Sequence, residues 1–394
     1  MTANVLFGTG GQAGPSAPAG APLHVAVIGT GFMARTHALG YRMVGGIFDL
    51  PRPVVLDTIV GAGESEAADA ARRLGFRRHS SDWRSVIADP AIEAVSITTP
   101  NALHAPIALA CVEAGKHCYC EKPLATTLAD AHAMVAAAEG AGVVTQVGFN
   151  YIRNPVLALA REMIAAGELG RITGFRGIHA EGYMCDPATP WTWRLASDGG
   201  GGALMDLGSH IVNMARFLLG PIDRVCGDVE TVVPARPVAP GSSEQRPVEV
   251  DDQARLLVHF ERGCSGTIEA SWTATGRTMQ LEFEVTGEKG ALVFTQERLN
   301  ELQYFRVESD GARNGFRTIA AGPQHPPYGN FCVAPGHQIG FNDLKTIEVG
   351  GFLEAIAGGD RPFADFREGY EVQRVIEAAQ LSSKERRWVD LDEA

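Results

Sequence analysis

Apolar and polar residues follow two different patterns along the chain, and the change falls near residue 147. In the first part, short apolar runs are separated by longer segments with helical spacing. The expected strands cover residues 23–28, 54–60, 94–98, 117–120 and 143–147, and the expected helices cover 35–43, 65–74, 102–114 and 128–141. Strands that alternate with helices form a parallel sheet covered on both faces. We therefore predict a doubly wound α/β domain over residues 22–147.

The second part, residues 148–394, is rich in β-branched residues with alternating polarity. Glycine turns such as Gly287-Glu-Lys-Gly290 separate its runs. The expected strands cover residues 172–179, 225–233, 252–260, 264–273, 280–286 and 291–295, and the expected helices cover 155–166, 206–219, 345–357 and 366–383. We predict an α+β domain on a large, mainly antiparallel sheet with one open face. Because open faces favour subunit pairing, we expect a homodimer or homotetramer that forms through this sheet.

Composition excludes several classes of function. The net charge of −12 argues against nucleic acid or an anionic membrane as a partner. Seven cysteines without paired or zinc-like spacing predict buried thiols rather than disulfides or a metal site. Residues 1–21, rich in Gly, Ala and Pro, predict a disordered tail without the pattern of a signal peptide. With no apolar run long enough to span a bilayer, we expect a cytoplasmic protein.

A glycine turn follows the first expected strand and opens a helix. It reads Gly29-Thr30-Gly31-Phe32-Met33-Ala34, where Gly29 permits the turn and Gly31 lets backbone approach a pyrophosphate. The free N–H groups of the helix then favour phosphate, which predicts a dinucleotide-binding Rossmann domain.

The same pattern requires an acidic residue after the second strand to bind the ribose, but Val60-Gly61-Ala62-Gly63 supplies none. Asp49 and Asp57 come before the strand ends. Glu64 is within reach, whereas Ser65 and Arg72 suit a 2′-phosphate. The cofactor is therefore NAD or NADP, of which we favour NAD.

Two motifs follow later strands of the same sheet. Ligands bind outside the carboxyl ends of parallel strands, so both motifs are expected at the nicotinamide end of the cofactor. They comprise Thr99, Pro100, Asn101 and His104 after one strand, and Glu121, Lys122 and Pro123 after the next.

In the second domain, Asp206 and His210 lie four residues apart on an expected helix and follow the run Gly199–Gly202. A histidine suits the removal of a hydroxyl proton, and a lysine can stabilise the alkoxide charge that develops. The alternatives are that Asp206 only caps its helix, His210 is structural and Lys122 is a surface residue.

Aromatic and basic side chains gather at the start of the second domain. Aromatic faces stack on sugar rings while polar tips bind hydroxyls, although the same residues can serve as core. We expect the substrate to contact Tyr151, Arg153, Tyr183, Trp191, Lys122, Asp206 and His210. We expect Trp193 and Arg194 to contact the cofactor.

Four stretches carry a family resemblance: the glycine turn continued by Ala34-Arg-Thr-His37, the TPNALH stretch, Glu121-Lys-Pro123 and Gly200-Gly-Gly-Ala-Leu-Met-Asp-Leu-Gly-Ser-His210. In these stretches the chain resembles the Gfo/Idh/MocA oxidoreductases. The resemblance runs from about residue 23 to the C-terminus. It implies that Lys122, Asp206 and His210 are the catalytic lysine, aspartate and histidine. Asn213 departs from the family, in which many members carry aspartate there.

Further stretches, such as Asp186-Pro-Ala-Thr-Pro-Trp-Thr-Trp-Arg194, resemble the family's dehydrogenases of anhydrosugars, sugars and inositols. The expected activity is therefore hydride transfer between NAD(P) and a secondary hydroxyl of such a carbohydrate. Two alternatives are an NAD-assisted glycoside-cleaving enzyme of the same fold and a non-catalytic nucleotide-binding regulator.

Overall fold

The computed structural model describes residues 20–393, and the chain divides into two compact units. The first unit contains the chain up to Arg153 together with Gly322–Tyr370, and the second contains Asn154–Ala321 and the chain from Glu371. The predicted tail lies almost wholly outside the described residues. The predicted boundary near residue 147 remains a prediction, but residues 322–370, which we assigned to the second domain, are part of the first unit.

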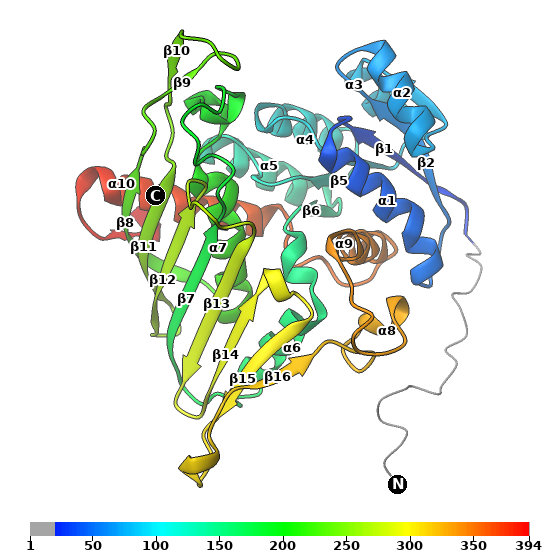
Figure 1. The fold of residues 1–394 in the computed structure, drawn as a ribbon. Coiled ribbons are helices and arrows are strands. Elements are labelled where there is room, and N and C mark those ends of the chain that lie inside the picture. Colours follow the sequence, from blue (N-terminus) through cyan, green and yellow to red (C-terminus); the bar gives the residue numbers. More distant parts are fainter. Residues whose placement is uncertain (1–19, 394) are drawn as a thin grey trace. The chain divides into compact units, whose positions relative to one another are not determined.

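The first unit is built on a six-stranded parallel sheet in the order β3-β2-β1-β4-β5-β6 (Figure 1). Its strands are β1 (Leu23–Ile28), β2 (Val54–Val60), β3 (Arg78–Ser80), β4 (Ala94–Ile97), β5 (His117–Cys120) and β6 (Thr145–Val147). The strand order reverses between β1 and β4, which pair directly. This is the predicted doubly wound arrangement, and the reversal creates a crevice at the carboxyl ends of β1 and β4.

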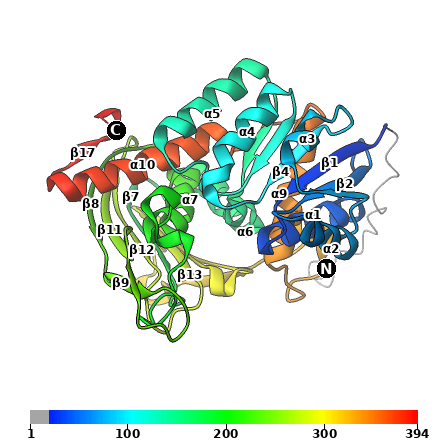
Figure 2. The same cartoon turned by 90° about the horizontal axis from the view of Figure 1, so that it is seen from above.

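Helices cover both faces of this sheet (Figure 2). They are α1 (Phe32–Ile47), α2 (Glu64–Leu74), α3 (Trp83–Ala88), α4 (His104–Glu113), α5 (Leu128–Ala141) and α9 (Phe341–Ile356), and the short α8 (Tyr328–Phe331) lies in the segment that leads to α9. One core joins β1 and β2 to α1, α2 and α9 through fully buried residues such as Val27, Ala38 and Phe352. The close approach of α1 and α9 depends on Gly40, where a Cβ would lie 3.1 Å from a methyl of Val349.

The second unit is built on a nine-stranded sheet in the order β16-β15-β14-β13-β7-β12-β11-β8-β17. Its strands are β7 (Ile172–Ala180), β8 (Ile222–Glu230), β11 (Gln253–Phe260), β12 (Ser265–Ser271), β13 (Gln280–Gly287), β14 (Gly290–Thr295), β15 (Glu301–Arg306), β16 (Arg317–Ala320) and β17 (Val389–Asp390). All neighbours are antiparallel except β7 and β12. The prediction of a large, mainly antiparallel sheet is confirmed.

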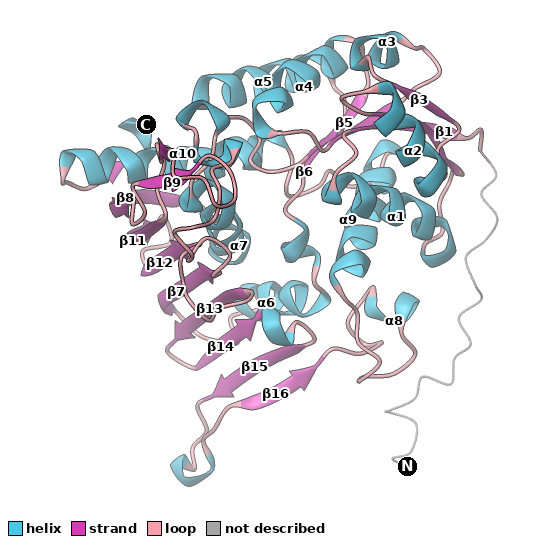
Figure 3. Ribbon diagram, turned by 45° about the horizontal axis from the view of Figure 1, so that its top comes forward, coloured by secondary structure: helices cyan, strands magenta, loops and turns pink. Residues whose placement is uncertain are grey.

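One face of the nine-stranded sheet packs on helices, and the other face has no helix over it (Figure 3). The helices are α6 (Pro155–Ala165), α7 (Ser209–Leu219) and the part of α10 (Phe366–Glu385) that belongs to this unit. Strand β11 shows the consequence, because its residues alternate between buried and more exposed positions. A short antiparallel pair, β9 (Ala235–Pro237) with β10 (Gln245–Pro247), forms a separate ribbon. No described helix is long and apolar enough to cross a membrane.

Candidate functional site

The glycine turn follows β1 as predicted. Gly29 has φ +119°, and a Cβ there would lie 2.4 Å from Oγ1 of Thr98, so only glycine is accommodated. A Cβ at Gly31, by contrast, would meet nothing within 4 Å. Gly31 is the N-cap of α1, and its residue type provides no side-chain cap for the helix N–H groups. Open space above an uncapped helix N-terminus fits the pyrophosphate of a dinucleotide, with Thr30, Phe32 and Met33 beside it.

No acidic residue directly follows β2, and the next carboxylates along the chain are at the start of α2. Asp57 is not available, because its carboxylate binds His24 and Arg78 inside the unit. Glu64 pairs with His79 at 3.0 Å, while Glu66 accepts a hydrogen bond from the hydroxyl of Thr30 in the glycine turn.

Of the two residues proposed to favour a 2′-phosphate, Arg72 pairs with Asp69, and its side chain is 74% exposed. The carboxylate of Glu66, by contrast, contacts the glycine turn, and its negative charge favours a ribose without a 2′-phosphate.

Histidine 104 connects the two motifs that follow β4 and β5. Its side chain is fully buried, Nδ1 lies 2.8 Å from the carbonyl oxygen of Pro123, and Nε2 lies 3.0 Å from that of Thr99. Pro100 and Asn101, which follow Thr99 in the chain, keep part of their surface exposed. Burial lowers the pKa of His104, so its neutral ring carries one N–H, which the shorter distance assigns to Nδ1 facing Pro123. His104 thus holds the second turn by a hydrogen bond and packs against the first, and its predicted direct contact with the cofactor remains a prediction.

Lysine 122 lies between two buried neighbours, Glu121 and Pro123, and is itself partly exposed. The carboxylate of Glu121 binds His37 at 2.7 Å and Lys345 at 2.9 Å inside the first unit. In the structure Glu121 therefore serves to hold the turn, and contact of its side chain with the cofactor is likewise untested. The sequence pattern alone did not reveal His37 or Lys345 as members of this site.

Two expected substrate residues of the first unit have interior partners. The ring of Tyr151 lies 6.2 Å from that of Phe341, and Phe341 stacks on Phe32 at 5.9 Å. The guanidinium of Arg153 donates to the side chain of Gln146 at 3.1 Å. Tyr151 thus belongs to an aromatic row that reaches Phe32 beside the glycine turn, whereas Arg153 is engaged within the unit.

The glycine run of the second unit packs tightly against residues 193–194. A Cβ at Gly199 would lie 2.5 Å from the carbonyl oxygen of Trp193, and one at Gly201 would lie 1.8 Å from that of Arg194. The run is therefore needed for a close backbone approach that any larger residue would block.

The segment after the glycine run differs from the prediction of one regular helix over residues 206–219. Residues Leu204–Gly208 form a π-helical turn, and α7 begins only at Ser209. Asp251 anchors the segment by accepting a hydrogen bond of 2.7 Å from the backbone N–H of Leu204. Asp206 consequently lies in a widened turn and His210 at the start of α7. Single π turns of this kind are frequent at functional sites.

Aspartate 206 is held by two side chains. The hydroxyl of Tyr183 donates to its Oδ2 at 2.9 Å, and Nε of Arg194 lies 3.9 Å from the same oxygen. The loss of water around the hydroxyl, followed by the charge of Asp206, raises the pKa of Tyr183, so this phenol remains a donor.

Histidine 210 is buried, and its ring lies 5.6 Å from that of His179 on β7. His179 in turn has Nδ1 2.9 Å from the carbonyl oxygen of Leu207 and Nε2 3.2 Å from Glu181. The sequence pattern gave no signal for His179 or Glu181, because neither belongs to a recognisable motif.

Trp191, expected to contact the substrate, and Trp193, expected to contact the cofactor, both have intramolecular partners. Trp191 donates to the carbonyl oxygen of Pro247, and the guanidinium of Arg246 lies 3.3 Å from the centre of its ring. The guanidinium of Arg194 lies 4.4 Å from the ring centre of Trp193. Trp191 therefore ties its loop to the β9–β10 ribbon. Among the described residues, no group of three or more His, Cys, Asp or Glu side chains is arranged to hold a metal ion.

A glycine turn at the switch point of a doubly wound sheet, with a lysine at the end of a neighbouring strand, defines a dinucleotide-dependent oxidoreductase. Family comparison agrees, because residues 23–149 match the oxidoreductase family with an NAD-binding Rossmann fold, and residues 157–293 match the GFO/IDH/MocA C-terminal domain. The chain belongs to the Gfo/Idh/MocA family.

Similar proteins within the family act on carbohydrates according to their names. Levoglucosan dehydrogenase of Pseudarthrobacter phenanthrenivorans is 40% identical over 94% of this chain and 98% of its own length. A solved levoglucosan dehydrogenase in complex with NADH and levoglucosan has a TM-score of 0.90, covers 94% of this chain and 99% of its own, and is 40% identical. The scyllo-inositol 2-dehydrogenase (NAD(+)) of Bacillus subtilis is 27% identical over 86% of this chain and 87% of its own length.

Proposed function

We propose that this protein is an NAD-dependent dehydrogenase that oxidises a secondary hydroxyl of a pyranose-like anhydrosugar, with levoglucosan as the first candidate substrate. The observation that carries the proposal is the 40% identity over 94% of the chain to levoglucosan dehydrogenase, whose solved complex contains NADH and levoglucosan. The retained Lys122, Asp206 and His210 support catalysis rather than nucleotide binding alone.

The glycine turn at Gly29–Met33 would hold NAD, which would supply the hydride acceptor for oxidation of the carbon that bears the reacting hydroxyl. In our proposal His210 accepts the proton of that hydroxyl, since a neutral imidazole is a suitable base near neutral pH. Lys122 donates a hydrogen bond to the same oxygen and stabilises the negative charge that develops there. Asp206, held by Tyr183 and Arg194, accepts a hydrogen bond from a neighbouring hydroxyl and orients the ring.

The test is to follow the formation of NADH and NADPH with purified enzyme over a panel of levoglucosan, glucose, L-sorbose and inositols. We expect NADH to accumulate in equal amount to the oxidised levoglucosan. Cleavage of a glycoside with no net NADH would favour the glycoside-cleaving alternative, and binding of NAD without turnover on any member would favour a regulator.

Catalytic roles are tested with Lys122→Met and His210→Ala. Each variant should bind NADH normally and lose about 100-fold or more in kcat, as expected for the loss of an alkoxide stabiliser or of a general base. Near-normal turnover in either variant would contradict the role proposed for that residue.

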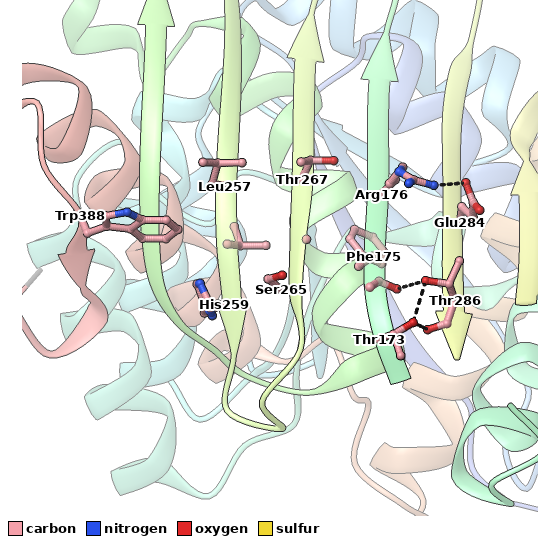
Figure 4. A pocket seen from close by; sticks show the side chains of 13 residues that line it. Thr173, Phe175, Arg176, Leu257, His259, Ser265, Thr267, Glu284, Thr286 and Trp388 are labelled. Carbon is pink, nitrogen blue, oxygen red and sulfur yellow. Dashed lines mark hydrogen bonds and ion pairs between the residues drawn. The ribbon is translucent and has the colours of Figure 1, made fainter. Parts of the chain in front are cut away.

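We also propose that the protein forms a homo-oligomer through the face of the nine-stranded sheet that carries no helix. Figure 4 shows a groove on this face, into which side chains of β7, β11, β12 and β13 project beside Trp388. Leu257 of β11 lies there with 50% of its surface exposed, and the ion pair Arg176–Glu284 lies on the same face beyond β12 (Figure 4). Apolar groups rimmed by charges are typical of protein interfaces.

Leu257→Glu should shift the protein to a smaller species in light scattering coupled to size exclusion. Val333→Glu, at an apolar residue of the first unit that is 68% exposed, is the control and should leave the size unchanged. An unchanged size for Leu257→Glu, or a monomeric wild type, would contradict the proposal.

All seven cysteines are free, which supports a reducing compartment such as the cytoplasm as the location of the protein.

A further inference from the structure

The turn that carries Lys122 is held by a buried group of charged side chains from distant parts of the first unit. At its centre is Lys345 of α9, which has no exposed surface. Its ammonium donates to Glu121 at 2.9 Å, to Glu348 at 2.7 Å and to the hydroxyl of Tyr119 at 2.9 Å. Three donor hydrogens thus meet three acceptors, so the ammonium is fully satisfied.

The ionised partner of Lys345 is Glu121. Burial by itself would raise the pKa of Glu121, but the charge of Lys345 and the hydrogen bond from His37 hold it well below its usual range. Burial by itself would lower the pKa of Lys345, but the negative charges of Glu121 and Glu348 outweigh this effect and raise that pKa. Burial raises the pKa of Glu348, so Glu348 is the less acidic of the two partners.

Both neighbours of Lys122 in the chain are therefore fixed from outside the turn. Glu121 is bound by His37 of α1 and Lys345 of α9, and the carbonyl oxygen of Pro123 is bound by His104 of α4. Between these two fixed, buried residues, Lys122 remains partly exposed. Because the backbone is fixed on both sides of Lys122, few orientations of its side chain remain possible.

We propose that Lys345 is a positioning residue, which through its buried ion pair with Glu121 sets the place of the Lys122 ammonium for hydride transfer. The inference rests on the proposed function of Lys122. A misplacement of about 1 Å in a reacting group can cost about 100-fold in rate. The buried Lys345–Glu121 pair, one residue from Lys122, is therefore expected to affect kcat as well as stability.

Glu348 offers a matched control for this proposal. It is as deeply buried as Lys345 and forms a second ion pair with it. Among the described residues, the hydrogen bonds of its side chain join Lys345 and Tyr119 rather than the turn at residues 121–123. Glu348→Gln should therefore disturb the interior of the unit without releasing the turn.

The experiment compares Lys345→Met, Glu348→Gln and Lys122→Met, each checked for folding by thermal melting and for NADH binding by fluorescence titration. We expect Lys345→Met to lower kcat by about 10- to 100-fold with nearly unchanged KM and NADH affinity. Glu348→Gln should keep kcat within about threefold of the wild type, whatever its loss in melting temperature. In the background of Lys122→Met, Lys345→Met should cause no further loss, because the group that it positions is absent.

Three results would overturn the inference: a folded Lys345→Met with wild-type kcat, equal losses in Lys345→Met and Glu348→Gln, or losses that multiply in the double variant. If Lys345→Met does not fold, Glu121→Gln, which keeps the shape and removes the charge, takes its place with the same expectations. If Lys122→Met itself retains turnover, the proposed function of Lys122 fails rather than the arrangement that holds it.

Discussion

The hydroxyl of Tyr183 donates a hydrogen bond of 2.9 Å to Oδ2 of Asp206, in the π turn that precedes α7. Arg194 approaches the same oxygen at 3.9 Å, so one oxygen of the carboxylate is occupied within the unit. The orientation of the carboxylate is thereby defined before any substrate is present. This relationship links the aromatic residues of the second unit to the residue that we expect to bind a substrate hydroxyl.

Tyr183→Phe should lower kcat/KM for the sugar by about tenfold, the loss expected when one hydrogen bond to a charged group is removed. The affinity for NADH should not change. Tyr304→Phe is the control, because it removes a buried hydroxyl from β15 of the same unit. Equal kcat/KM values for Tyr183→Phe and the wild type would show that Asp206 needs no such support.

His179 is expected to support the π turn through its hydrogen bond to the carbonyl oxygen of Leu207. His179→Ala removes this donor, whereas His179→Asn can supply another through its side-chain amide. We expect kcat to fall by about 10-fold or more in the alanine variant and by less in the asparagine variant. If steady-state kinetics show the two variants to be equally impaired, the bond to Leu207 is not the relevant contact.

The architecture could be predicted from the sequence because its signals are local. Apolar runs, glycine turns and alternation identified both sheets, and the confirmed strands differ from the predicted ones by few residues. The short strands β3, β9, β10, β15, β16 and β17 were missed, since most of them are two to four residues long and lack the apolar run that marks β4 and β5. The π turn was also missed, and the hydrogen bond that holds its first residue, from Leu204 to Asp251, joins residues far apart in the chain.

The candidate site shows the same division between local and distant signals. Lys122 stands in a recognisable motif, and Asp206 and His210 share another. Lys345 lies 224 residues from Glu121, and a lysine within an expected helix carries no sign of burial in the sequence. Only the fold brings α9 back to the first unit. Residues that hold a motif in place are thus harder to predict than the motif itself.

Cofactor preference should depend on Glu66, whose carboxylate accepts a hydrogen bond from Thr30 in the glycine turn. Glu66→Gln removes a negative charge that would repel a 2′-phosphate. We expect the ratio of kcat/KM for NAD over NADP to fall by about tenfold, which corresponds to one lost charge interaction of about 1.4 kcal/mol. Glu113→Gln, which removes an exposed negative charge at the last residue of α4, is the control and should leave the ratio unchanged. An unchanged ratio in Glu66→Gln would mean that selection lies elsewhere.

Stability should depend on pH through Asp251, which anchors the π turn from a buried position. Burial raises its pKa from 3.8 to about 6. A folded-state pKa above the unfolded value means that the associated stability is fully present below pH 3.8 and is lost as the pH rises through 6. The change amounts to no more than about 3 kcal/mol by the free-energy equivalent of a pKa shift.

Asp251→Asn mimics the protonated carboxyl and should remove this dependence. Urea unfolding of both proteins between pH 4 and pH 7 tests this prediction. The contributions of the other titrating groups cancel when the two free energies of unfolding are subtracted. We expect the free energy of unfolding of the wild type, relative to Asp251→Asn, to decrease across this range and to level off only towards pH 7. A constant difference would show that Asp251 is ionised at the same pH in the folded and unfolded protein, and an increase would reverse the sign of its shift.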